Sequence, residues 1–283
     1  MLLCPRCQSG IPDTQEKCPT CGHHAGPPNV RAANSEYEVR VLDERYQAAL
    51  ENARSRGCLA VAERLFESAD RSSAVINVDA RFLYHFAASK NTLYANYEHL
   101  VAGNVRKPGA FENHAARRSV VTTLIWAYAG DKLYAALSLT GLGLDSYGPY
   151  AMTLRDLAIN QRATVLENNS FDFVKKHQLL GGNQRPAGCF ATWRDRNKLA
   201  VAKLEASLTP QTTDDDFQRL LLASNGNRAT DEFIEVQIYG PFDLGAVECV
   251  RGNSKVGSKE ERSLLRMAKQ YLKNADIAWI EHD

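Results

Sequence analysis

The sequence predicts an α+β protein in which helices flank a mainly antiparallel β-sheet. Segments with strand-like alternation and segments with helical periodicity follow one another without the strand–helix–strand rhythm that builds a parallel sheet. The chain has 283 residues, of which 44% are hydrophobic, so it can bury one large core and also carry small appendages. The predicted organisation has three parts, which span residues 1–26, 27–73 and 74–283.

Charge and hydropathy exclude several broad classes of protein. The formal net charge is +1, so no global basic field draws the chain to nucleic acid or membrane, and any such binding must use a local patch. Residues 1–30 lack the apolar region of a signal peptide, and no apolar run is long enough to cross a bilayer. Three of the seven cysteines are scattered singles, which argues against a disulfide framework. We therefore expect a cytoplasmic protein with no membrane partner.

The first 26 residues carry the most specific motif of the chain. Cys4 and Cys7 form one Cys-x-x-Cys pair, and Cys18 and Cys21 form a second pair after ten intervening residues. Two such pairs can hold one tetrahedral Zn²⁺ ion, and Gly22 permits the left-handed backbone that often follows the second cysteine. The segment resembles a small zinc ribbon. Four cysteines leave no open coordination position, so we expect a structural metal; a redox dithiol, the alternative, lacks a thioredoxin-like context.

Residues 27–73 are predicted to form a stiff linker and then one or two helices. Apolar residues recur at three- to five-residue intervals among charged residues from Ser35 onward. An arginine stripe accompanies them, matched by Glu and Asp, and this pattern is typical of a solvated face; contact with nucleic acid is the alternative. The stripe comprises Arg40, Arg45, Arg54, Arg56, Arg64 and Arg71.

From residue 74 onward, predicted strands and helices mix. The Ser258-x-x-Glu261 pattern predicts a capping box that opens the last helix. The expected strands cover 75–78, 81–86, 133–139, 150–154, 162–166, 232–239 and 277–280, and the expected helices cover 91–103, 112–128, 192–207, 214–224 and 259–274.

The functional prediction rests on the strand within residues 231–241. Apolar, mostly β-branched residues alternate there with a face that carries Glu235 and Gln237 between two aromatic side chains. Such a face either lines a site or is the solvated side of an edge strand, and the pattern alone leaves both open.

Two further predicted strands carry polar residues. Tyr84 and His85 lie on the strand at 81–86, before Asn91, and Ser138 and Thr140 share a face of the segment that follows residue 133. A lone histidine in a strand is more often a core residue than a catalyst, and hydroxyls are common in strands. The chain has no P-loop, dinucleotide fingerprint, Gly-x-Ser-x-Gly elbow or His-Glu-x-x-His motif, which argues against the enzyme classes that use them.

The order of these strands resembles the ADP-ribosyltransferase superfamily, in which three motifs on a split antiparallel sheet line an NAD⁺ cleft. The segment from Tyr84 to Asn91 is similar to the first motif of the His-bearing branch, which includes bacterial toxins that modify DNA. Residues 137–140 are similar to the second motif, and residues 145–164 to the stretch that follows it in several bacterial members. Residues 233–241 resemble the third motif and place Glu235 at the catalytic glutamate. The resemblance covers about residues 74–250.

The resemblance implies a role for each matched residue. Glu235 would stabilise an oxocarbenium-like transition state, His85 and Asn91 would orient the nicotinamide ribose, and Ser138 would support Glu235. In the commoner third motif, Glu-x-Glu or Gln-x-Glu, the catalytic glutamate is the second of the two polar residues, whereas here Glu235 precedes Gln237. Because of this departure, Glu232 remains a rival for the catalytic role. Gln237 is expected to join Glu235 as a catalytic residue in the cleft, and Tyr84 and Thr140 are expected to help bind NAD⁺.

An arginine is expected to pair with the phosphates of NAD⁺. Arg118 is the candidate, and Arg117 and Arg162 are the alternatives, because no motif fixes the position.

These implications predict a mono-ADP-ribosyltransferase that uses NAD⁺ as substrate and holds a structural Zn²⁺. We expect a toxin of a toxin–antitoxin or anti-phage defence system, with an RNA such as mRNA, or DNA, as acceptor. An antitoxin or chaperone is the expected protein partner, with the zinc ribbon as a contact surface. The alternatives are a transferase that modifies a protein and a catalytically dead adaptor that binds through its ribbon.

Overall fold

A computed structural model describes residues 2–95, 131–224, 226–228 and 230–282. Eight strands form one continuous sheet in the order β12-β11-β5-β3-β4-β10-β6-β7. Only β11 and β12 pair in parallel within this sheet; the other neighbours are antiparallel. The α+β class with a mainly antiparallel sheet is therefore confirmed, although the described sheet is continuous where a split sheet was predicted. The strands are β3 (Ser73–Val78), β4 (Lys132–Ser138), β5 (Tyr150–Leu154), β6 (Ala163–Leu166), β7 (Phe190–Thr192), β10 (Glu235–Tyr239), β11 (Val247–Gly252) and β12 (Ala278–Glu281).

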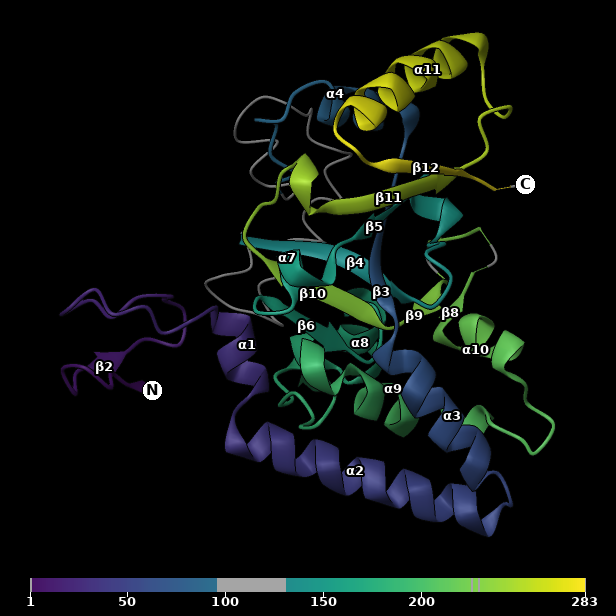
Figure 1. The fold of residues 1–283 in the computed structure, drawn as a ribbon. Helices are drawn as coiled ribbons and strands as arrows, with labels where there is room; N and C mark the ends of the chain where they lie inside the picture. Colours follow the sequence, from purple (N-terminus) through teal and green to yellow (C-terminus); the bar gives the residue numbers. More distant parts are fainter. Residues whose placement is uncertain (1, 96–130, 225, 229, 283) are drawn as a thin grey trace.

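Helices gather at both ends of this sheet (Figure 1). Three of them, α2 (Glu36–Ser55), α3 (Leu59–Asp70) and α9 (Arg196–Leu204), pack together at one end. At the other end α4 (Ala80–Ala87) packs against α11 (Lys259–Asn274). Ser258 and Glu261 form the predicted capping box at the start of α11.

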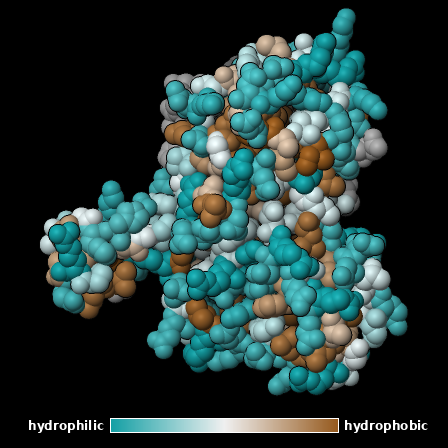
Figure 2. All heavy atoms as spheres, in the orientation of Figure 1, coloured by the Kyte–Doolittle hydropathy of each residue, from teal (hydrophilic) through white to brown (hydrophobic). Residues whose placement is uncertain are grey.

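The remaining elements are short. A small ribbon of β1 and β2 protrudes from the body, and Figure 2 shows it as a separate lobe. The short elements are β1 (Leu2–Leu3), β2 (Gly10–Ile11), α1 (Pro28–Ala33), η2 (Asp145–Tyr147), α7 (Asp156–Ile159), α8 (Ser170–Lys176), η3 (Leu179–Gly181), η4 (Trp193–Asp195), η5 (Glu205–Ser207), α10 (Asp214–Leu221), β8 (Leu222–Ala223), β9 (Glu232–Phe233) and η6 (Leu244–Ala246).

The two faces of the sheet differ in chemistry. Val236 and Ile238 of β10 are fully buried in the main core, which also takes in apolar residues of α3, α4, α9 and α11. Because side chains alternate along a strand, Glu235 and Gln237 point to the opposite face. β10 lies between β4 and β6, so the edge-strand explanation of its polar side is wrong.

The opposite face is covered near β10 by the short helices α1 and α8. Phe173 and Val174 of α8 pack there with Leu166 of β6 and Phe190 of β7 in a second, smaller core. The polar side of β10 is thus enclosed within the protein.

The segment with Tyr84 and His85 is a helix, so the predicted strand at 81–86 is wrong. The Asp79 side chain accepts the N–H of Phe82 and caps α4. Leu83 and Phe86, three residues apart, bury the same side of the helix, and this helical spacing outweighs the alternation seen in the sequence.

Other expected elements are only partly described. Residues 91–95 are not helical, so the helix predicted to open at Asn91 does not begin there. The rest of that helix and the predicted helix at 112–128 lie outside the described residues. No helix in the part of the chain that the structure describes is long and apolar enough to cross a membrane.

Candidate functional site

A hydrogen-bonded network surrounds the Glu235 carboxylate on the polar face of the sheet. Gln237 Nε2 donates to Glu235 Oε1 over 2.8 Å, and Lys132 Nζ donates to Gln237 Oε1 over 2.6 Å. From α8, Ser170 donates its backbone N–H to Glu235 Oε2 over 3.1 Å and its hydroxyl to Oε1. Glu235 is 5% exposed, and Lys132 and Gln237 are each 1% exposed, so all four groups are shielded from water by the fold itself.

Burial shapes the charge of this network. Desolvation raises the pKa of Glu235, while hydrogen bonds from Ser170 and Gln237 and the positive charge of Lys132 oppose that rise. Desolvation also lowers the pKa of Lys132 well below its usual range, and the negative charge of Glu235 opposes that fall. Each group therefore favours the charged form of the other.

Helix α1 seals the same face beside Gln237. Asn29 is fully buried, and its Nδ2 donates to the Thr164 hydroxyl over 3.2 Å and to the Gln237 carbonyl over 3.3 Å. The same nitrogen donates to the Arg162 carbonyl over 3.0 Å. This asparagine thus fixes α1 to the neighbouring strands β6 and β10.

Two residues farther along α1, Arg31 hydrogen-bonds to the N-terminal ribbon. Arg31 Nη2 donates to the carbonyls of Pro12, Asp13 and Gln15, at 3.2, 3.2 and 2.7 Å. A single short helix therefore contacts both the ribbon and the strand that bears Glu235.

The four ribbon cysteines converge on one point. Their sulfur atoms lie within 4.8 Å of one another, with Cys4–Cys21 and Cys7–Cys18 distances of 3.5 Å. A tetrahedral Zn²⁺ with Zn–S bonds of about 2.3 Å places its sulfurs roughly 3.8 Å apart, so the cluster fits this ion. Hydrogen bonds with Ser9 lower the pKa of the Cys7 thiol to about 6, whereas burial and the neighbouring cysteine thiols raise the pKa of Cys21 to about 12. The pKa shifts thus favour the thiolate that a metal requires at Cys7 and disfavour it at Cys21.

The two cysteine turns share one backbone geometry. Gly22 follows Cys21 with φ of 69°, which confirms the predicted left-handed residue, and Gln8 follows Cys7 with φ of 61°. Gln8 is one of three non-glycine residues with positive φ in the described chain. In both turns the N–H of this left-handed residue donates to the carbonyl of the first cysteine of the pair, over 2.9 Å.

The structure separates Glu235 from the residues matched to the first motif. His85 is exposed on α4, its ring 5.0 Å from that of Tyr84, which in turn packs 6.0 Å from Tyr271 of α11. α4 belongs to the core on the apolar face of the sheet, whereas Glu235 points to the polar face. Asn91 is exposed in a turn. The predicted grouping of these residues around one ligand is therefore absent from this conformation.

Ser138 lies on the polar face but does not contact Glu235. Its hydroxyl donates to the Leu142 carbonyl over 2.7 Å and accepts from Gln218 Nε2 over 3.2 Å, which ties the turn after β4 to α10. Thr140 is exposed within that turn. The support for Glu235 that was expected from Ser138 comes instead from Ser170.

The arginine candidates fare differently. Arg117 and Arg118 lie outside the described residues. Arg162 Nη1 donates to the carbonyls of Tyr239 and Pro241, at 3.0 and 2.8 Å, so it closes the end of β10 and has a structural role. Glu232, the rival carboxylate, is exposed on β9 and takes no part in the network.

Arg185 stacks on Phe190 on the polar face, and Arg251 of β11 points to the same face farther along the sheet. Its Nη1 donates to the Thr153 hydroxyl over 2.9 Å, and it forms no ion pair with a described residue. β11 lies four strands from β10 in the sheet, a separation of roughly 19 Å at about 4.8 Å per strand. A ligand held at Glu235 could therefore reach Arg251 only with its far end.

Much of the arginine stripe is paired with carboxylates. Ion pairs join Arg45 to Glu167 at 2.7 Å and Arg56 to Glu205 at 2.7 Å, and so fix α2 to the body. Arg64 of α3 pairs with Asp214 at 2.8 Å. These contacts support the structural interpretation of the stripe over nucleic-acid contact.

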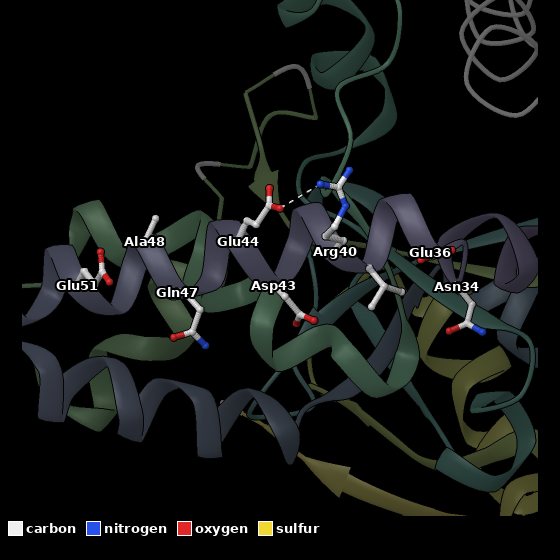
Figure 3. Close-up of a pocket in the computed structure, with 9 residues that line it drawn as sticks. Asn34, Glu36, Arg40, Asp43, Glu44, Gln47, Ala48 and Glu51 are labelled. Atoms are coloured by element: carbon white, nitrogen blue, oxygen red, sulfur yellow. Dashed lines mark hydrogen bonds and ion pairs between the residues drawn. The ribbon is translucent and has the colours of Figure 1, made fainter.

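A surface depression lies elsewhere, along the outer side of α2 (Figure 3). It encloses about 880 Å³ and is lined mainly by polar side chains of that one helix. Arg40 and Glu44 pair across it at 3.3 Å. None of its lining residues belongs to the Glu235 network, so it adds nothing to that site.

Two residues of the network were missed in the sequence. Lys132 shares its strand face with Ser138 by simple alternation, but the predicted strand began at residue 133 and left Lys132 out. Ser170 follows Asn169, whose side chain accepts the N–H of Asp172 and caps α8. An N-cap is visible in sequence, but nothing local indicates that the helix it starts would meet a strand 65 residues later.

The fold and site define an α+β protein with a mainly antiparallel sheet, an enclosed Lys–Gln–Glu–Ser network and a four-cysteine cluster suited to a metal. A scan against models of known protein families finds no match to this chain. A search of curated proteins likewise finds no similar sequence.

Proposed function

We propose that the protein is a mono-ADP-ribosyltransferase in which Glu235 is the catalytic carboxylate. The observation that carries the proposal is an ionisable glutamate on an interior strand of the sheet, oriented by Gln237 and placed on a polar face. Its strand also bears the resemblance to the third transferase motif. Buried carboxylates with opposed influences on their pKa are characteristic of functional sites.

The described conformation is closed over this carboxylate. Ser170 donates to both oxygens of Glu235, including one bond from its hydroxyl. A ribose 2′-hydroxyl would make the same bond to a catalytic glutamate, so Ser170 occupies the position of the substrate group. Transfer therefore requires α8 to move away from β10 and admit NAD⁺.

The chemistry follows from the carboxylate. The glycosidic C1′–N bond of NAD⁺ breaks, and its electron pair leaves with nicotinamide. Glu235, bonded to the 2′-hydroxyl, stabilises the positive charge that develops on the ribose. A nucleophile of the acceptor forms the new bond at C1′, and Glu235 accepts the proton that this nucleophile loses.

A nucleic acid, RNA such as mRNA or DNA, is the proposed acceptor, and a toxin of a defence or toxin–antitoxin system is the proposed role. Both rest on the ribbon and on the sequence similarity to the DNA-modifying branch, although the helix that bears Tyr84 and His85 lies away from Glu235 in this conformation. Ion pairs engage Arg45, Arg56 and Arg64 of the arginine stripe, which weakens the case for contact between this stripe and a nucleic acid, so a protein acceptor stays the alternative.

We infer that the ribbon binds Zn²⁺ through its four cysteine thiolates. The ion would supply folding energy to a segment too small for a core of its own. An antitoxin or a chaperone is the partner proposed for this lobe.

One observation favours a different class of function. The enclosure of Glu235 by Lys132, Gln237 and Ser170 also suits a purely structural network, in which case the protein is an adaptor that binds through its ribbon. The two functions differ in whether NAD⁺ is consumed.

The test is release of nicotinamide from NAD⁺ by the whole protein in the presence of RNA, DNA or cell protein. Glu235→Gln should reduce release at least a hundredfold. Glu232→Gln, which changes a neighbouring exposed glutamate, is the matched control and should act like the wild type. No release with any acceptor, together with no heat of NAD⁺ binding, would establish the adaptor. Transfer of label to nuclease-sensitive or protease-sensitive material then identifies the acceptor.

A further inference from the structure

Lys132, Gln237 and Glu235 form a chain of hydrogen bonds with a fixed direction. An ammonium group can only donate, so the Gln237 oxygen must face Lys132 Nζ, which lies 2.6 Å away. The Gln237 amide nitrogen must then face the other way, toward Glu235 Oε1 at 2.8 Å. The carboxylate, which can only accept, requires the same orientation, so the lysine and the carboxylate together fix which end of the amide meets Glu235.

The position of Lys132 is costly for a lysine with no further role. Its side chain is fully buried at the start of β4, and its ammonium lies 5.4 Å from the centre of the Phe190 ring. Arg185 stacks on the same ring at 5.1 Å, which adds a like charge nearby. A well-packed apolar side chain in place of such a buried ion is often neutral or stabilising.

The groups that hold Glu235 come from two different kinds of element. Ser170 belongs to α8, a helix of seven residues, whereas Lys132 and Gln237 belong to adjacent central strands of the sheet. If α8 is displaced by a substrate, only the strand residues keep their place. The hydrogen bond from Gln237 to Glu235, and the one from Lys132 to Gln237, would thus persist when the carboxylate is exposed.

We propose that Lys132 is a positioning residue for Glu235, which it orients through Gln237 and keeps ionised by its charge. This role rests on the proposed function and deepens it. It assigns the support of the catalytic carboxylate to a lysine on β4 instead of to Ser138.

The test is the titration of the Glu235 carboxyl carbon by NMR, in whole protein labelled at glutamate and assigned by the signal lost in Glu235→Gln. Lys132→Met should move this titration to higher pH, because the favourable charge is gone. Lys198→Met is the matched control: it removes a partly buried, ion-paired lysine on α9 and should leave the titration unchanged. An unchanged titration in Lys132→Met overturns the proposal.

The same titration of Glu235 in Gln237→Met is a second test, which does not depend on whether Lys132→Met folds. Gln237→Met leaves the lysine in place but breaks the chain of hydrogen bonds, and it should also raise the pH at which Glu235 titrates. Combined with Lys132→Met, it should add less than the sum of the single effects, because both act on one path. Full additivity, or no effect of Gln237→Met, contradicts action through the amide.

Activity gives a readout that a merely structural lysine would not change. At neutral pH, nicotinamide release by Lys132→Met should fall about tenfold or more, and it should recover in part as the pH is raised and Glu235 ionises. A uniform loss at every pH contradicts the role. If the titration moves while the wild type releases no nicotinamide, the positioning role stands and the proposed transferase activity fails.

Discussion

Ser170 binds both oxygens of the Glu235 carboxylate, one through its backbone N–H and one through its hydroxyl. The two residues are 5% exposed each, so the contact lies inside the protein. A carboxylate that accepts two bonds from one residue is held in a single orientation. The same contact closes the polar face of the sheet.

Removal of the Ser170 hydroxyl should open this contact. A hydrogen bond to a charged group contributes about 1.5–3 kcal/mol, so Ser170→Ala should destabilise the closed arrangement by an amount in that range. If NAD⁺ must displace α8, its affinity should rise by roughly ten- to a hundredfold, as measured by calorimetry. Ser55→Ala, which removes an exposed hydroxyl on α2 bonded to the Asn52 carbonyl, is the control. Weaker NAD⁺ binding in Ser170→Ala would show that the serine helps to hold the substrate and does not exclude it.

The stability of the protein should depend on pH through Glu235. Burial raises the pKa of this group in the folded state above its usual value of 4.5, so the folded protein binds more protons than the unfolded chain above that pH. The contribution of Glu235 is therefore fully present below 4.5 and is lost as the pH rises through the folded pKa. Glu235→Gln should remove this falling component from denaturation midpoints measured from acid to neutral pH.

Lys132 acts with the opposite sign, which allows the two groups to be separated. Burial lowers the pKa of Lys132 in the folded state well below 10.5. Between this folded pKa and 10.5 the unfolded chain binds the extra proton, so the stability of the protein rises as the pH increases across that range. Lys132→Met should remove this rise at alkaline pH, whereas Glu232→Gln should leave both slopes in place. A pH profile unchanged by either network variant would contradict the burial of these charges.

The ribbon should bind one zinc ion per chain. Its four sulfur atoms lie within 4.8 Å, which suits a single tetrahedral ion. Metal analysis should find one equivalent of zinc, and Cys18→Ser should lose most of it. Cys249→Ser changes a buried cysteine outside the cluster and should retain the metal in full. Retention of zinc by Cys18→Ser would contradict a four-cysteine site.

The sequence was most informative where a pattern is local. Alternation placed Glu235 and Gln237 on one face of a strand, and the spacing of the cysteines predicted their cluster. The cover over Glu235 was not predictable, because Ser170 is brought to it by packing of α8 and not by any signal near either residue. His85 was misplaced for a local reason: Asp79 caps a helix whose apolar spacing also fits a short strand.

Asn29 should be the residue that joins the ribbon segment to the sheet. Its side-chain nitrogen reaches Arg162, Thr164 and Gln237 from a fully buried position. Asn29→Ala leaves these buried acceptors without their donor, so we expect a loss of about 1–3 kcal/mol in the free energy of unfolding. Asn34→Ala, at the exposed end of the same helix, is the control and should cost much less.

Because Arg31 ties α1 to the ribbon, Asn29→Ala should also increase hydrogen exchange of the backbone amides of residues 13 to 15. Exchange confined to α1 would show instead that the ribbon and the sheet move independently.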